Sequence, residues 1–91
     1  MAAYIVTFDL KKSGGNYAGL WSAIRGYTSS AQISPSSYGI ETNDSAGAVF
    51  DNLEKYLERY DFLYVIELGK GLAGRGSDKA NSWLQEHMEA V

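Results

Sequence analysis

Two hydrophobic periods alternate along this chain, and their order restricts the fold more than any other feature of the sequence. Apolar side chains alternate with a period of two over residues 4–10 and 62–68, which predicts strands. Spacings of three and four, typical of amphipathic helices, occur over residues 17–27 and 45–59. Between them, residues 31–34 and 38–42 flank a turn at Pro35 and predict a hairpin.

The predicted order is strand, helix, strand, strand, helix, strand, followed by a last helix. A split pair of βαβ units is typical of the ferredoxin-like plait, so we expect an α+β fold of the βαββαβ type with an additional C-terminal helix. The 91 residues suffice for one domain. Within residues 1–91 we expect a plait core over 1–68, a glycine loop over 69–76 and the helix over 77–91. The sheet should be antiparallel, with the first two helices on one face.

The strand patterns also predict which side chains face the core. In the first strand, Tyr4, Val6 and Phe8 share one face. The last strand is apolar on both faces, so we expect it to lie beside the first strand at the centre of the sheet, covered on both sides. One of its faces carries Leu63 and Val65, and the other carries Phe62, Tyr64, Ile66 and Leu68.

Polar residues at the helix starts predict the caps. We expect Asn16 to cap the first helix, Asn43 or Asp44 the second, and Ser77 the last. On the last helix, Trp83 and Leu84 should cover exposed sheet or partner surface.

The composition excludes several classes of protein. There is no cysteine, and therefore no disulfide scaffold or thiolate metal site. No run approaches the roughly 20 apolar residues of a membrane helix, and no secretion signal is recognisable, so we expect a cytoplasmic protein without membrane contact. The net charge of −3 does not favour nucleic-acid binding, which usually shows as a basic domain. The largest basic cluster is Lys11-Lys12.

Aromatic residues are numerous for so short a chain: seven Tyr, three Phe and two Trp. Surplus apolar surface marks interfaces, so we predict a homodimer. The alternative is a base-stacking surface, with Tyr4, Phe8 and Tyr64 on one sheet face as in RNA-recognition domains. His87, the one histidine, lies on the apolar face of the last helix and is expected to be packed rather than to bind a metal.

Asp9 ends an otherwise apolar strand directly before Lys11 and Lys12, and two interpretations are open. A carboxylate at a strand end usually accepts hydrogen bonds in the following turn. Alternatively, Asp9 is a ligand of a hard cation such as Mg²⁺ or Mn²⁺. One carboxylate binds Mg²⁺ weakly, but a two-fold dimer could supply a second Asp9.

The strand Tyr4-x-Val6-x-Phe8-Asp9-Leu10 and several later segments, within about residues 3–68, resemble the CRISPR-associated Cas-two family and the related VapD group. The first strand, ending in Asp9, is similar to the first strand of that family. Further similar segments are the helix with Leu20, Ile24 and Tyr27, the hairpin with Gln32-Ile33-Ser34 and Ser36-Ser37-Tyr38-Gly39-Ile40, and the strand Asp61-x-Leu63-x-Val65-Ile66-x-Leu68. The small SinR-like proteins of this superfamily end in a helix that Ser82-Trp83-Leu84 resembles.

The resemblance implies a ferredoxin-like homodimer and two hypotheses for its function. The first is a protein-interaction module in a defence or toxin–antitoxin-type cassette. The second is a metal-dependent endonuclease acting on RNA or DNA. In it, Asp9 from both subunits would hold Mg²⁺ or Mn²⁺, and Lys11 and Lys12 would hold the nucleic-acid backbone.

Overall fold

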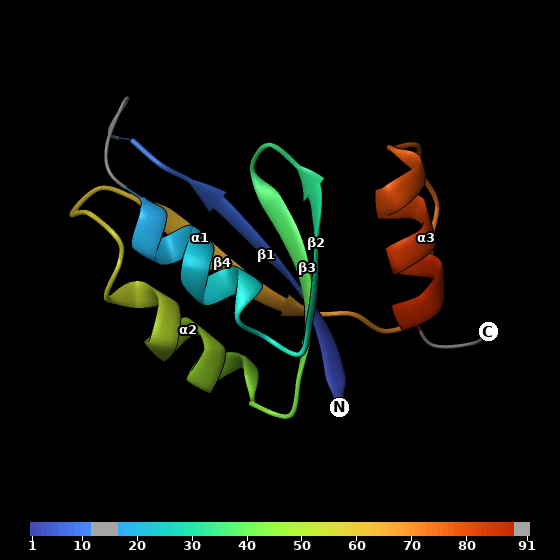
Figure 1. Ribbon diagram of the computed structural model, residues 1–91, viewed down its shortest axis with the longest axis horizontal. Coiled ribbons are helices and arrows are strands. Elements are labelled where there is room, and N and C mark those ends of the chain that lie inside the picture. Colours follow the sequence, from blue (N-terminus) through green and yellow to red (C-terminus); the bar gives the residue numbers. More distant parts are fainter. Residues whose placement is uncertain (12–16, 89–91) are drawn as a thin grey trace.

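A computed structural model describes residues 1–11 and 17–88. The elements are β1 (Ala2–Asp9), α1 (Ala18–Arg25), β2 (Ser29–Ser34), β3 (Ser37–Thr42), α2 (Ala46–Glu54), β4 (Phe62–Glu67) and α3 (Asp78–His87). The strands form one antiparallel sheet in the order β2-β3-β1-β4 (Figure 1). The predicted small α+β fold, with its four-stranded antiparallel sheet and three helices, is confirmed.

Both α1 and α2 pack on one face of the sheet, as predicted (Figure 1). Each helix buries residues four positions apart, Leu20 and Ile24 in α1 and Val49 and Leu53 in α2, so one stripe of each faces the strands. The buried residues of this core are Tyr4, Val6, Phe8, Tyr17, Leu20, Ile24, Ile40, Val49, Leu53 and Leu63. The predicted shared face of Tyr4, Val6 and Phe8 is therefore the helix-covered one.

The cap predicted for α2 is wrong by one or two residues. Ser45, rather than Asn43 or Asp44, is the N-cap, because its hydroxyl accepts a hydrogen bond from the Ala48 amide at 3.1 Å. The Asp44 amide instead donates to Thr42 Oγ1, within the turn that leads into the helix. Asn16, the predicted cap of α1, lies outside the described residues, and Tyr17 occupies the N-cap position.

The prediction that the last strand is central and covered on both sides is also wrong. β4 does lie beside β1, with Val6 opposite Val65, but it is an edge strand. The β2–β3 hairpin occupies one side of β1, so the strand that returns after α2 can pair only on the other side. Leu63 is the one buried residue of β4, and the side chains that alternate with it face away from the helices.

The opposite face of the sheet, the outer face, is covered in part by α3. Trp83 packs against Ala3 and Ala31, and its Nε1 donates to Ser29 Oγ at 3.0 Å. Its ring lies so close to Gly39 that a Cβ at this position would overlap it. Ser77 caps α3 by accepting from the Ala80 amide, as predicted. Trp83 thus performs the predicted covering of the sheet.

None of the helices within the described ranges has the length and hydrophobicity that crossing a membrane requires.

Candidate functional site

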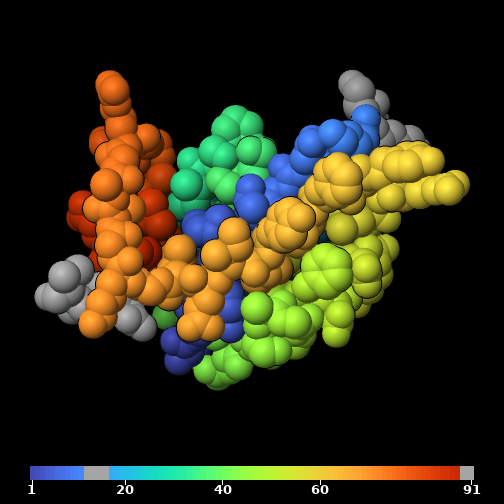
Figure 2. All heavy atoms as spheres, turned by 180° about the vertical axis from the view of Figure 1, so that it is seen from behind, coloured from blue at the N-terminus to red at the C-terminus, as the bar shows by residue number. Residues whose placement is uncertain are grey.

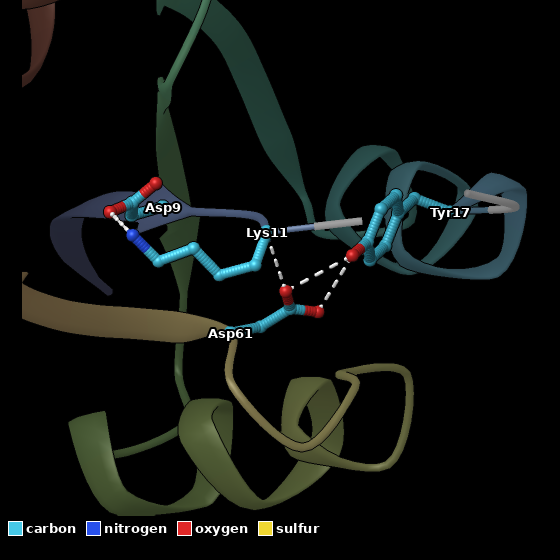
Figure 3. A network of polar contacts seen from close by, with 4 residues as sticks. All are labelled: Asp9, Lys11, Tyr17 and Asp61. Atoms are coloured by element: carbon cyan, nitrogen blue, oxygen red, sulfur yellow. Dashed lines mark hydrogen bonds and ion pairs between the residues drawn. The ribbon is translucent and has the colours of Figure 1, made fainter. Parts of the chain in front are cut away.

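Asp9, the main candidate of the sequence analysis, is the last residue of β1 and is exposed. Its Oδ2 lies 2.6 Å from Lys11 Nζ (Figure 3), and the two side chains are 62% and 49% exposed respectively. An ion pair so accessible to water contributes little to stability. Lys11 Nζ also lies 5.6 Å from the centre of the Phe62 ring, at the start of the neighbouring strand. The Lys11 ammonium is therefore already engaged at this end of the sheet.

A second carboxylate at this end, Asp61, was not singled out from the sequence. Its oxygens accept hydrogen bonds from the Lys11 amide at 2.7 Å and from the Tyr17 hydroxyl at 2.9 and 3.0 Å (Figure 3). They also accept one from the Glu58 amide at 2.8 Å. One side chain thereby joins the end of β1, the start of α1 and the turn before β4. The only sequence signal was an aspartate in a turn. Its partners 44 and 50 positions away carry no local signature.

Hydrogen bonding determines the acidity of Asp61. Desolvation raises the pKa of this carboxyl, but the hydrogen bonds from the Lys11 and Glu58 amides and the Tyr17 hydroxyl, with the charge of Lys11, outweigh it. The net result is a pKa below the ordinary value of 3.8. Since its oxygens already accept these hydrogen bonds, Asp61 is a structural residue in this arrangement.

A single protomer does not supply the donor set of the divalent cation that the resemblance implies. Among residues 1–11 and 17–88, no three His, Cys, Asp or Glu side chains are grouped as a metal site would require. The nearest partner of the Asp9 carboxylate is an ammonium group, which takes the position of a cation. Mg²⁺ prefers two acidic ligands or a phosphate. Lys12, the other predicted nucleic-acid contact, lies outside the described residues.

The outer face of β4 carries exposed apolar side chains, which we call the apolar row: Phe62, Tyr64 and Ile66. They are 58%, 68% and 54% exposed. Figure 2 shows that β4 crosses this side of the molecule uncovered, while α3 and the segment before it lie at one end. Tyr64 stands opposite Thr7 of β1, and Ile66 stands opposite Ile5. Three of the seven exposed large hydrophobic residues of the described chain thus lie on one face of this strand, and the other four, Met1, Tyr56, Tyr60 and Leu72, lie outside it.

Asp9 borders the apolar row, since it stands opposite Phe62 in the sheet. A shallow hollow of about 330 Å³ is lined by Asp9, Thr7, Phe8 and the first two residues of the row, Phe62 and Tyr64. The row and the ion pair therefore form one continuous surface, polar at one end and apolar along its length.

The base-stacking alternative is wrong. Tyr4 and Phe8 are buried beneath the helices, at 3% and 8% exposure, whereas Tyr64 belongs to the outer face. Tyr64 stands opposite Thr7, and the side chain of Thr7 points to the other side of the sheet from that of its neighbour Phe8. The three rings therefore do not share a face.

His87 is packed, as predicted. Its ring is stacked on Trp83 with the ring centres 4.1 Å apart, and its Nδ1 donates to the Trp83 carbonyl at 2.8 Å. Its Nε2 lies 3.9 Å from Glu41 Oε1 on β3. His87 is therefore held within α3 by Trp83, and its ring lies beside Glu41 of the sheet.

Comparisons of this chain with protein families, curated proteins and solved structures found no match. The resemblance to the Cas-two family remains a prediction.

Proposed function

We propose that this protein is an interaction module: a ferredoxin-like plait that forms a homodimer through the outer face of β4 and binds a protein partner. The plait is supported by the split βαβ order and by the position of β1 between β3 and β4. A defence or toxin–antitoxin-type cassette is the setting that the sequence resemblance favours.

The apolar row is the observation that carries this proposal. At about 200 Å² for each fully exposed side chain, its three members expose roughly 350 Å² per protomer. A standard interface takes about 800 Å² from each partner. The row alone supplies nearly half of that area, and Ile5, Thr7 and the Asp9–Lys11 pair around it can supply more.

Metal-dependent cleavage of nucleic acid, using Asp9 from both subunits, is the second candidate. The observation that favours it is the position of Asp9 beside the apolar row, since a dimer formed through the row would bring a partner near this carboxylate. The Lys11 ammonium and the acidic net charge support the interaction module instead.

Sedimentation velocity of two matched variants tests the homodimer. Tyr64→Glu places a charge in the middle of the apolar row, whereas Tyr60→Glu makes the same change at a site of similar exposure, 66% against 68%, before the strand begins. Burying an unpaired carboxylate is costly, so Tyr64→Glu should raise the dimer dissociation constant at least about 100-fold. Tyr60→Glu should leave it near the wild-type value.

A wild-type protein that sediments as a monomer at tens of micromolar would overturn the homodimer, as would equal weakening by both variants.

A further inference from the structure

The backbone of β4 has a free edge. The Leu68 amide donates to the Ala3 carbonyl at 2.8 Å, and hydrogen-bonded pairs alternate along an antiparallel ladder. Residues 64 and 66 therefore also pair with β1. The amides and carbonyls of Leu63, Val65 and Glu67 point the other way, and no strand of the described chain lies on that side.

Apart from the charge of Glu67 at its end, this edge carries few of the features that protect an edge strand against an incoming strand. Natural edge strands are blunted by proline, lysine, a bulge or a covering segment. β4 contains neither proline nor lysine, and its register with β1 is regular over all six of its residues. At about 3.3 Å per residue, the edge can pair with an extended segment roughly 20 Å long.

A groove runs beside the free edge, between β4 and α2. Two hollows of about 420 and 360 Å³ form it, and both are lined by Phe50, Leu63 and Tyr64. Val65 and Ala46 line one of them, and Glu54 lines the other. An added strand would find apolar surface from α2 on one side and the β4 backbone on the other, the arrangement used in β-strand addition.

The charges along this groove are mainly acidic. Glu54, Glu58 and Asp61 line the end where β4 begins. Glu67, which lies just beyond the lining of the two hollows, is exposed where β4 ends. The one basic side chain of the lining, Arg59, places its guanidinium 5.3 Å from the centre of the Tyr60 ring. Electrostatic complementarity therefore favours an occupant with basic residues at its ends.

A second copy of β4 fits this edge poorly. Two-fold pairing of β4 with itself would place both α2 helices on the same face of a continuous sheet, so the helix of each copy would compete for the groove of the other. A strand without its own covering helix avoids this conflict.

We infer that the groove between β4 and α2 binds an extended peptide of a partner protein, with alternating apolar residues and with lysine or arginine at its ends, which adds as a fifth strand to the sheet. This inference rests on the proposed interaction function and names the mode by which that partner is bound.

Nuclear magnetic resonance with a defined probe, the peptide acetyl-KVTVTVK-amide, tests it on the full chain. Binding should slow hydrogen exchange at the amides of Leu63, Val65 and Glu67 and leave those of Tyr64 and Ile66 nearly unchanged. At low ionic strength the control peptide acetyl-EVTVTVE-amide should bind at least about fivefold more weakly. Val65→Pro removes the central amide donor of the free edge and leaves the hydrogen bonds between β4 and β1 intact. This variant should therefore not bind the peptide.

The outcomes separate this inference from the homodimer. No binding at millimolar peptide, or spectral changes confined to the apolar row, would overturn the peptide groove and leave the homodimer standing. Peptide binding by a protein that sediments as a monomer would retain the groove and remove the homodimer. If Val65→Pro fails to fold, hydrogen exchange in the wild-type protein decides whether the peptide binds at the free edge: the peptide should slow exchange at residues 63, 65 and 67 and not at 64 and 66.

Discussion

At the start of β4, the carboxylate of Asp61 joins segments that are far apart in the sequence. It accepts hydrogen bonds from two backbone amides and from the Tyr17 hydroxyl, and its pKa lies below the ordinary value. A carboxyl with a lowered folded-state pKa stabilises the fold above its unfolded pKa. That contribution is lost as the pH falls through the folded pKa.

We expect Asp61→Asn to lower the free energy of unfolding at neutral pH by about 1 kcal/mol. The asparagine side chain replaces one acceptor oxygen by an NH₂ group, which cannot accept a hydrogen bond from the backbone amides. The variant should also lose part of the acid dependence that the wild type shows below about pH 4, near the reference carboxyl pKa. Urea unfolding at several pH values measures both effects. Tyr17→Phe, which removes one donor and keeps the carboxyl, should retain most of the acid dependence. Identical pH profiles for Asp61→Asn and the wild type would contradict this role.

The Asp9–Lys11 pair leads to a second expectation at the residue scale. Asp9→Asn should change the free energy of unfolding by less than about 0.5 kcal/mol, since both partners are exposed to water. Calorimetric titration of Mg²⁺ and Mn²⁺ into the wild type, with and without an oligonucleotide, should show no binding. Metal binding by the wild type that disappears in Asp9→Asn, but persists in the exposed-carboxylate control Asp51→Asn, would favour the endonuclease instead.

Among the elements, α3 packs on the sheet through Trp83, whose ring lies directly against Gly39. Because a Cβ at position 39 would overlap the indole, Gly39→Ala should cost about 1–3 kcal/mol by overpacking. In a Trp83→Ala background the same change should be nearly neutral. Urea unfolding of the four proteins of this cycle gives the coupling. Gly47→Ala, in α2 with only Ser45 Oγ within 4 Å of the added Cβ, is the control and should be neutral or stabilising. Equal costs of Gly39→Ala in both backgrounds would refute the contact.

The elements were predictable where local periodicity determines them. The helical spacings of Leu20 with Ile24 and of Val49 with Leu53, and the alternation of Tyr4, Val6 and Phe8, correspond to buried faces. The edge position of β4 was not predictable from its apolar pattern, because two-sided hydrophobicity is typical of a buried strand and of an interface strand alike. The partners of Asp61 were not predictable either, since they come from other elements.

On the scale of the whole molecule, the outer face of the sheet is divided between two uses. α3 covers the part over β2 and β3, whereas the part over β4, which carries the apolar row, is uncovered. A chain with a net charge of −3 and an exposed apolar strand is better suited to a protein surface than to a phosphate backbone. We therefore propose the uncovered row as the surface through which the homodimer forms.

Isotope-filtered nuclear Overhauser spectroscopy on a mixture of labelled and unlabelled protein tests this claim most directly. We expect intermolecular contacts among the side chains of Phe62, Tyr64 and Ile66, and their loss in Tyr64→Glu but not in Tyr60→Glu. A sample without intermolecular contacts at these three side chains, or with contacts centred on α1 or α3 instead, would contradict it.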